Sequence, residues 1–222
     1  MNPTDNGTIH YKDELVRKLI HLCSLSIPIV YYFITKESAI IILSVLTFLA
    51  LIIDLSRYFS SGFGKLFYKI FGFLLRRHEV DSRKKNLNGA TYVLLSALIG
   101  VIVFPKVIFI TAFAILIISD SLAALIGRKF GKHKFLSKSL EGTLTFFVSA
   151  SIVVLFTPKI DGRMVEYGIG IFAALIGTLA ENLSFGFADD NLTIPISIGI
   201  TMWLLYGAFL PEVQLVLQNV PR

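Results

Sequence analysis

Apolar residues in this chain are grouped in long blocks rather than in the short alternating runs typical of exposed strands. Each block is about 17–21 residues long, which is enough for a helix to cross the hydrocarbon core of a bilayer. We count seven such blocks: 15–34, 38–55, 89–105, 107–126, 142–158, 165–183 and 193–210. The pattern predicts an all-α polytopic membrane protein, with residues 1–222 in one compact domain and no soluble domain attached.

A shorter amphipathic segment lies between the second and third blocks. Over residues 63–75, apolar side chains recur at helical spacing, and Lys65 and Lys69 fall between them. A helix of this kind lies in the membrane interface. Basic residues that would attract anionic lipid follow it: Arg76, Arg77, Arg83, Lys84 and Lys85. We expect an interfacial helix that acts either as an orientation anchor or as one wall of a lipid entrance.

The composition agrees with a membrane protein, since 55% of the residues are apolar and the mean hydropathy is +0.73. The net charge of +6 would indicate a nucleic-acid partner in a soluble protein, but here the basic residues are sorted by side. The N-terminal segment and every second connection carry 16 of the Lys and Arg residues, and the other side carries five. This bias predicts a cytoplasmic N-terminus and no nucleic-acid partner, in either a bacterial inner membrane or an ER-like membrane.

The densest polar stretch runs from Asp120 to Thr143, between the fourth and fifth blocks. Asp120 lies within the fourth block and Glu141 directly precedes the fifth. Five cations lie between these two acids: Arg128, Lys129, Lys132, Lys134 and Lys138. Carboxylates hold Mg²⁺, and cations together with backbone N–H groups hold phosphates. The stretch therefore predicts a nucleotide site at the membrane surface.

Ionisable residues within apolar blocks are costly in a membrane, and each is a candidate for a functional site. Under the predicted topology, they all lie near the cytoplasmic ends of their blocks: Arg17, His21, Asp54, Asp120 and Glu181, with Glu14 and Glu141 at block edges. Glu14, Arg17 or Lys18, and His21 recur at helical spacing. A transporter or flippase would distribute such groups through the membrane depth. The one-sided distribution favours a reaction at the inner interface.

The connection before the last block is acidic on a side that is otherwise basic, because Asp189, Asp190 and Asn191 fill it. Metal binding explains these acids economically, since Mg²⁺ is usually held by one or two carboxylates together with substrate phosphates. Purely structural roles are the alternatives for three candidates: a helix cap for Asp189, an ion pair with Arg57 for Asp54, and an interface hydrogen bond for His21. The glycine pattern at 127–132 lacks the spacing of a P-loop.

Three stretches together resemble the polyprenol kinase family, which includes dolichol kinase, phytol kinase and CTP-dependent diacylglycerol kinase. Residues 14–21 (ELVRKLIH) are similar to the start of the family. Residues 120–132 (DSLAALIGRKFGK) and 137–143 (SKSLEGT) resemble its central nucleotide motif. Glu181, followed by residues 189–195 (DDNLTIP), resembles its C-terminal motif. The apolar blocks between these stretches agree with the family in number and order.

The resemblance implies a Mg²⁺-dependent kinase that phosphorylates a membrane lipid alcohol with CTP as the donor. The acceptor would be an isoprenoid alcohol such as phytol or a polyprenol, or diacylglycerol. The implied catalytic residues are Asp120, Glu141, Asp190, Glu181, Arg17 and His21. Those implied to bind the nucleotide are Gly127, Arg128, Gly131, Lys132, Ser137, Lys138, Gly142, Thr143 and Asn191. The implied metal ligands are Asp120, Glu141, Asp189 and Asp190.

The central motif also resembles that of phosphatidate cytidylyltransferase, which likewise uses CTP and makes CDP-diacylglycerol. That family continues with a Lys-Asp pair and a Pro-Gly-His-Gly-Gly run near its C-terminus. This chain has the sequence DDNLTIP at 189–195 instead. The difference favours phosphorylation of a lipid alcohol over formation of a CDP-lipid.

Overall fold

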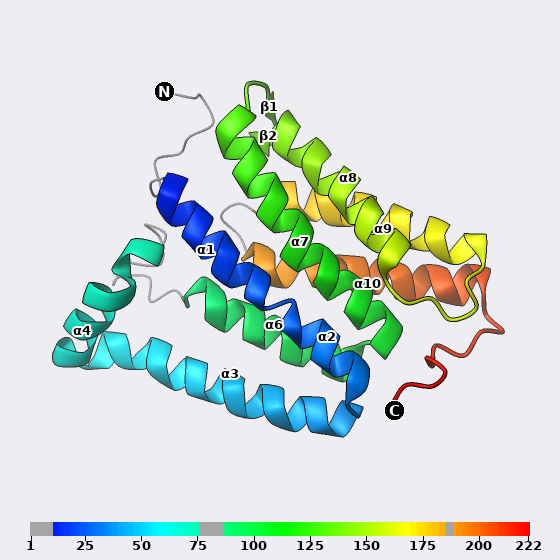
Figure 1. The fold of residues 1–222 in the computed structure, drawn as a ribbon, viewed down its shortest axis with the longest axis horizontal. Helices are drawn as coiled ribbons and strands as arrows, with labels where there is room; N and C mark the ends of the chain where they lie inside the picture. The colour runs from blue at the N-terminus through cyan, green and yellow to red at the C-terminus, as the bar shows by residue number, and fades with distance from the viewer. Residues whose placement is uncertain (1–10, 76–86, 185–188) are drawn as a thin grey trace.

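The computed structural model describes residues 11–75, 87–184 and 189–222, which form a bundle of helices with one small β-hairpin (Figure 1). The first half contains α1 (Tyr11–Cys23), α2 (Ser26–Phe33), α3 (Lys36–Phe59), α4 (Ser61–Phe71), the 3₁₀ helix η1 (Gly72–Leu74) and α6 (Gly89–Val103). The second half contains α7 (Lys106–Phe130), β1 (Lys134–Phe135), β2 (Lys138–Ser139), α8 (Leu140–Phe156), α9 (Met164–Leu183) and α10 (Asp190–Phe209).

Side-chain caps determine where several helices begin. Thr35, Asn88, Ser139 and Asp189 each accept a hydrogen bond from a backbone N–H in the first turn of α3, α6, α8 and α10, respectively. These are residue types that favour the N-cap because a short oxygen-bearing side chain satisfies an otherwise unpaired donor. The polar residues at the edges of the apolar blocks therefore define the helix ends as well as the candidate site.

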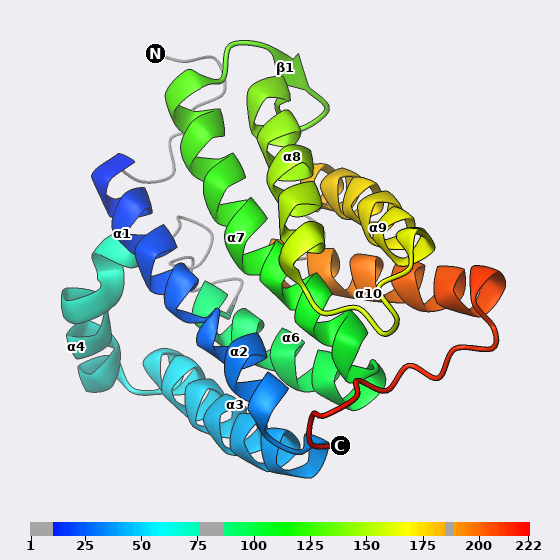
Figure 2. The ribbon, with the colours of Figure 1, turned by 45° about the vertical axis from the view of Figure 1, so that its right-hand side comes forward.

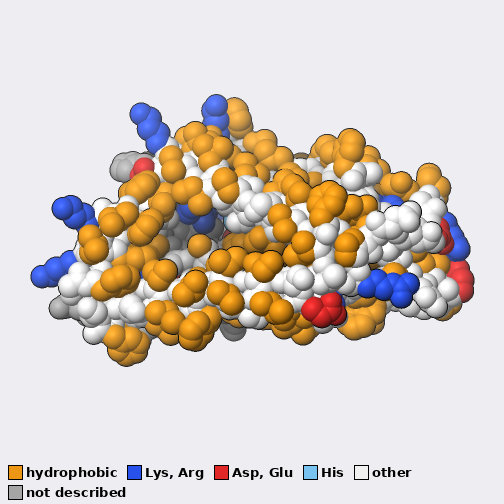
Figure 3. All heavy atoms as spheres, turned by 60° about the horizontal axis from the view of Figure 1, so that its bottom comes forward, with side chains coloured by type: hydrophobic (Ala, Val, Ile, Leu, Met, Phe, Trp, Pro, Cys, Tyr) orange, Lys and Arg blue, Asp and Glu red, His pale blue; other side chains and the backbone are white. Residues whose placement is uncertain are grey.

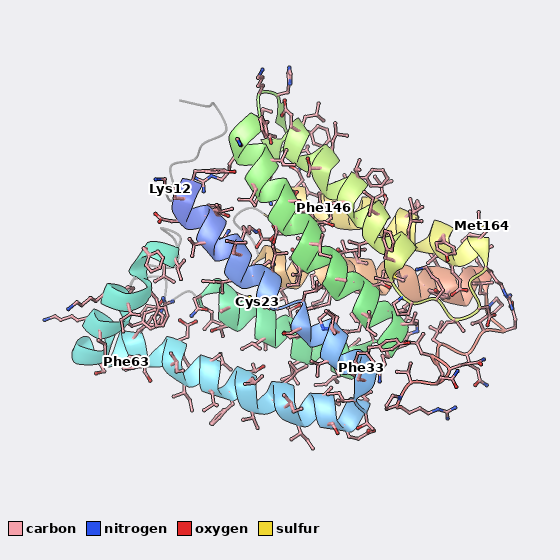
Figure 4. All side chains as sticks on the ribbon, viewed as in Figure 1. Lys12, Cys23, Phe33, Phe63, Phe146 and Met164 are labelled. Atoms are coloured by element: carbon pink, nitrogen blue, oxygen red, sulfur yellow. The ribbon has the colours of Figure 1, made fainter. Side chains whose placement is uncertain are left out.

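The helix α7 forms the centre of the bundle. Its side chains from Val107 to Ile117 are all buried, as expected for a helix that is apolar on every side. The helices α8 and α10 pack against it from one side, and α1 and α2 pack against it from another (Figures 1 and 2). Figure 4 shows Phe146 of α8 beside α7, where this side chain is fully buried. The helix α3 packs on α6 and α4 and is more peripheral.

The outer surfaces of the helices carry many exposed apolar side chains, and hydrophobic side chains are spread across the face drawn in Figure 3. Within the described ranges, five segments are long and apolar enough to cross a membrane: Tyr11–Phe33, Lys36–Phe59, Lys106–Phe130, Met164–Leu183 and Asp190–Phe209. The apolar helices α6 and α8 are shorter, at 15 and 17 residues. All seven predicted blocks are therefore helical, whereas the seven-span topology and the cytoplasmic N-terminus stay predictions.

The interfacial segment predicted at 63–75 is helical and comprises α4 and η1. The helix α4 turns back from the end of α3, and η1 contacts α1. Whether the segment anchors the protein or borders a lipid entrance stays a prediction. The basic residues predicted to follow it, between 76 and 86, lie outside the described residues.

The hairpin of β1 and β2 is an exception to the all-α prediction. The two strands are antiparallel, with Lys134 opposite Ser139 and Phe135 opposite Lys138. Leu136 in the turn has a φ of 52°, in the left-handed region. The sequence did not predict this hairpin because strands of two residues are too short to show an alternating pattern.

The C-terminal segment lies at the end of the bundle where α7 begins, opposite to the hairpin. Lys106 Nζ donates to the carbonyl oxygens of Ile34 and Pro221, at 2.7 and 2.5 Å. The backbone N–H of Lys36 donates to the carbonyl of Arg222 at 3.2 Å. The connections before α3 and α7 therefore meet the C-terminus at the end of α7 that is farther from Asp120.

Candidate functional site

The contact between α1 and α7 includes a buried ion pair. Lys18 Nζ donates to the Asp120 carboxylate, and the two side chains are only 2% and 4% exposed. His21 Nε2 lies 3.7 Å from the same oxygen, Asp120 Oδ2. Lys12 and Cys23, labelled in Figure 4, mark the ends of α1 along this contact. The structure thus brings the first and central predicted motifs together, and it selects Lys18 as the residue that contacts Asp120.

A second ion pair, between a partly exposed lysine and buried carboxylates, joins the hairpin to α9 and α10. Lys138 Nζ lies 2.5 Å from Glu181 Oε1 and 3.9 Å from Asp190 Oδ2. Burial alone would lower the pKa of Lys138, but the carboxylates of Glu181, Asp190 and Asp120 raise it above its ordinary value. The lysine is therefore charged, and it contacts the carboxylates of α9 and α10 while the carboxylate of α7 acts on it electrostatically. We call Lys18, Asp120, Lys138, Glu181 and Asp190 the buried charge cluster.

Asn182, which is fully buried at the end of α9, holds the hairpin in place. Its side-chain oxygen accepts the backbone N–H groups of Ser137 and Lys138, at 3.3 and 3.2 Å. The side-chain nitrogen of Asn182 donates to Thr143 Oγ1 at 2.5 Å. The Ser137 hydroxyl donates to the backbone carbonyl of Asn182. Ser137 and Thr143, which the resemblance implies as nucleotide ligands, are thus both engaged inside this joint. Asn182 is not among the site residues predicted from the sequence, although its position at the end of an apolar block was a usable signal.

The glycines of the central motif allow α7 and α8 to approach closely. A Cβ on Gly127 would lie 2.9 Å from Ser139 Oγ and 3.3 Å from the Cα of Gly142. The backbone N–H of Gly131 already donates to the carbonyl of Gly127 at 3.0 Å, and that of Gly142 donates to Ser139 Oγ at 3.2 Å. These bonds occupy both amides, so neither of these two N–H groups is available to a phosphate.

Apart from Lys138, the cations of the central motif are either partly buried or exposed. Arg128 is partly buried and lies 3.3 Å from Glu14 Oε2 on α1, measured from its Nη1. Glu14 also pairs with Arg17, the residue that directly precedes Lys18 of the buried charge cluster, so two guanidinium groups meet at one carboxylate. Three lysines of the stretch are exposed: Lys129, Lys132 and Lys134. The end of α7 is therefore strongly positive at its surface.

Glu141 does not join Asp120 in the buried charge cluster. Its carboxylate lies at the surface, 2.8 Å from His133 Nδ1, and it also accepts the backbone N–H of His133. Hydrogen bonds from backbone N–H groups, its own foremost, and from His133 lower the pKa of Glu141 to about 2. The predicted metal set that combines Asp120 with Glu141 is thus not assembled in this structure, because the two side chains have different partners.

Asp189 and Asn191 interact with each other at the start of α10. Asp189 Oδ1 accepts the backbone N–H of Asn191 at 2.9 Å and its side-chain amide at 2.6 Å. This is the helix cap that was the structural alternative for Asp189. Asp190 points instead to the buried charge cluster. Within the acidic connection, Asp189 therefore caps α10, whereas Asp190 lies beside Lys138 of the buried charge cluster.

Asp54 belongs to a separate structural contact, as its alternative interpretation predicted. Its Oδ1 lies 2.9 Å from Arg57 Nε, and its Oδ2 accepts the backbone N–H of Asn88 at 2.7 Å. The Arg57 guanidinium also lies 4.6 Å from the centre of the Tyr58 ring. This contact joins the end of α3 to α4 and to the start of α6, and it contributes no group to the buried charge cluster.

The buried charge cluster fits Mg²⁺ only in combination with phosphate oxygens. Across the described residues, no group of three or more His, Cys, Asp or Glu side chains is arranged to hold a metal ion by itself. Mg²⁺ is commonly bound by one or two carboxylates, several waters and substrate phosphates. Asp120 and Asp190 can supply those carboxylates. Glu181 Oε2 is buried and makes no hydrogen bond among the described residues, so it is a further oxygen at the same place.

Comparison with known proteins gives relatives along most of the chain. An uncharacterized protein of Rickettsia prowazekii is 31% identical over 185 residues, which cover 83% of this chain and 90% of that protein. CTP-dependent diacylglycerol kinase 1 of Schizosaccharomyces pombe is 28% identical over 165 residues, or 68% of this chain and 74% of that enzyme. Dolichol kinase of the same yeast is 34% identical over 92 residues, which are 40% of this chain and 17% of that enzyme. No family model and no solved structure matches the chain.

Proposed function

Since the chain belongs to the polyprenol kinase family, we propose that it is a CTP-dependent lipid kinase acting on a membrane lipid alcohol. The observation that carries this proposal is the buried charge cluster. Two lysines and three carboxylates converge there from α1, α7, the hairpin, α9 and α10. All five residues fall in the stretches that resemble the family. Relatives named as CTP-dependent diacylglycerol kinases support CTP as the donor.

The nucleotide phosphates would bind beside the cluster at the positive end of α7. Arg17, Arg128 and Lys132 offer cationic groups there, and Arg forms paired hydrogen bonds with phosphate oxygens. Phosphoryl transfer depends mainly on positioning and on stabilising the charge of the transferred group. Mg²⁺, when bound by Asp120 and Asp190, would neutralise part of the phosphate charge. Lys18 and Lys138 would keep these carboxylates close together despite their mutual repulsion.

The reaction would convert CTP and a lipid alcohol into CDP and a lipid monophosphate. The hydroxyl oxygen forms a bond to the γ-phosphorus while the bond from that phosphorus to the β–γ bridging oxygen breaks. The hydroxyl proton passes to a carboxylate and then to solvent. We assign that role to Glu181, because its Oε2 is buried at the cluster without a hydrogen-bond partner among the described residues. Asp190 is the alternative.

The apolar outer surfaces of the helices would keep the acceptor lipid in the bilayer beside the site. We propose that the site faces the cytoplasm, because the connections that carry it hold most of the basic residues. The acceptor is either an isoprenoid alcohol, such as phytol or a polyprenol, or diacylglycerol. Purified protein in nanodiscs, incubated with Mg²⁺ and CTP, should convert one of these alcohols to its monophosphate. Absence of any lipid phosphate with all three alcohols would contradict the proposal.

A further inference from the structure

Glu14 connects two arginines that come from different helices. Its Oε1 lies 2.6 Å from Arg17 Nη2, and its Oε2 lies 3.3 Å from Arg17 Nε. The same Oε2 lies 3.3 Å from Arg128 Nη1, in the last turn of α7. Both carboxylate oxygens therefore bind guanidinium groups, and Glu14 itself is buried. The sequence named Glu14 as a candidate without a role, whereas Arg17 and Arg128 were implied as catalytic and nucleotide-binding residues.

The arrangement keeps two positive groups together at the edge of the site. Without Glu14, Arg17 and Arg128 would repel each other, and no carboxylate between them would offset that repulsion. Their side chains are 16% and 20% exposed, so they are accessible to a ligand, whereas the carboxylate that joins them is not. A planar guanidinium fits the oxygens of a phosphate group, and two held side by side fit a chain of phosphates.

We propose that Glu14 is a positioning residue that holds Arg17 and Arg128 as a two-arginine clamp for the polyphosphate of the nucleotide. The inference rests on the proposed function, because it assumes that this site binds a nucleoside triphosphate. The proposal gives the arginines and Glu14 different roles. The arginines contact the phosphates, and Glu14 acts through them without contacting the ligand.

A purely structural role for Glu14 would be to attach α1 to α7. The ion pair of Lys18 with Asp120 lies one helical turn further along α1 and attaches the same two helices. Loss of the Glu14 charge should therefore leave α1 in place while disturbing the two arginines. This difference allows a clamp to be distinguished from a structural contact.

The test compares Glu14→Gln with Asp13→Asn, which removes a neighbouring, half-exposed acid from the same turn. Three quantities are measured in nanodiscs: the KM for CTP, the KM for the lipid and kcat. Glu14→Gln should raise the KM for CTP about tenfold with little change in the other two, since one charge-assisted contact is worth about that factor. Asp13→Asn should behave like the wild type, and Glu14→Asp should recover part of the affinity.

Two further measurements keep the clamp separate from the proposed function. Arg17→Lys retains the charge but removes the planar guanidinium group with its paired N–H donors, so it should also raise the KM for CTP. Binding of a non-hydrolysable CTP analogue is measured directly by titration of the wild type and of Glu14→Gln. Weaker analogue binding by a folded Glu14→Gln variant supports the clamp even if no lipid is phosphorylated. Unchanged binding, or equal losses for nucleotide and lipid, would overturn it.

Discussion

Lys18 and Asp120 are 102 positions apart in the chain and form an ion pair that is buried between α1 and α7. Each residue belongs to a different stretch of family resemblance, so the pair joins two motifs into one site. A buried charge that loses its partner is strongly destabilising. The pairing therefore explains why a lysine is placed within an apolar helix, where it would otherwise be costly.

The first prediction concerns Asp120 itself. Asp120→Asn keeps the shape of the side chain but removes the charge that Lys18 contacts and that Mg²⁺ would need. We expect turnover to fall roughly a hundredfold or more, because electrostatic groups of this kind dominate catalysis. Asp161→Asn, which alters an acid paired with Arg163 outside the site, should have little effect. A folded Asp120→Asn protein that retains its activity would rule out this role.

The second prediction compares two lysines on the same hairpin. Lys138 contacts Glu181, whereas Lys134 is exposed. Lys138→Met should lower stability by about 2 kcal/mol and reduce kcat, because it leaves Glu181 and Asp190 without the lysine that they contact. Lys134→Met should change neither quantity appreciably. Thermal unfolding in detergent and steady-state kinetics measure the two effects, and equal behaviour of the two variants would contradict the assignment.

The third prediction concerns the joint at Asn182. Asn182→Ala removes the acceptor of two hairpin N–H groups and the donor to Thr143. We expect a loss of about 2 kcal/mol in stability and a higher KM for CTP, since buried donors are left unsatisfied and Lys138 is no longer held. Thr145→Ala is the control, because its hydroxyl makes only a local bond to the carbonyl of Glu141 among those observed. A normal KM in a stable Asn182→Ala protein would show that the joint is not needed.

The fourth prediction is that Asp190 binds Mg²⁺ and Glu141 does not. Asp190 belongs to the buried charge cluster, and Glu141 pairs with His133 at the surface. Asp190→Asn should therefore raise the Mg²⁺ concentration for half-maximal activity by about tenfold, whereas Glu141→Gln should leave it unchanged. A titration of activity against Mg²⁺ measures both. The opposite result would return Glu141 to the metal site and remove Asp190 from it.

Much of the fold follows from the apolar blocks, because all of them are helical, but local chemistry adds details that block length cannot give. The first block is interrupted between Cys23 and Ser26, where α1 ends and α2 begins. Pro28 lies in the first turn of α2, a position that proline tolerates because its missing N–H is not needed there. That residue is a signal for the break which a count of apolar residues overlooks.

The candidate site was predictable in its residue types but not in its pairings. The one-sided distribution of acids grouped Asp120, Glu181 and Asp190, and in the structure Lys138 contacts Glu181 and Asp190. It also grouped Glu141 with Asp120, although Glu141 lies on the surface beside His133. Which lysine reaches which acid depends on how each helix is rotated and how far it is shifted along its neighbour. Sequence spacing fixes neither quantity for residues that are 43 or 102 positions apart.

The most direct test of the central claim is the fate of each phosphate of CTP. Purified protein is incubated with Mg²⁺ and lipid, in parallel with CTP labelled at the α- or the γ-phosphate, and the lipid products are separated. A lipid kinase should transfer only the γ-label, giving a lipid monophosphate and CDP. Transfer of the α-label to lipid with release of pyrophosphate would show CDP-lipid formation and would contradict the account.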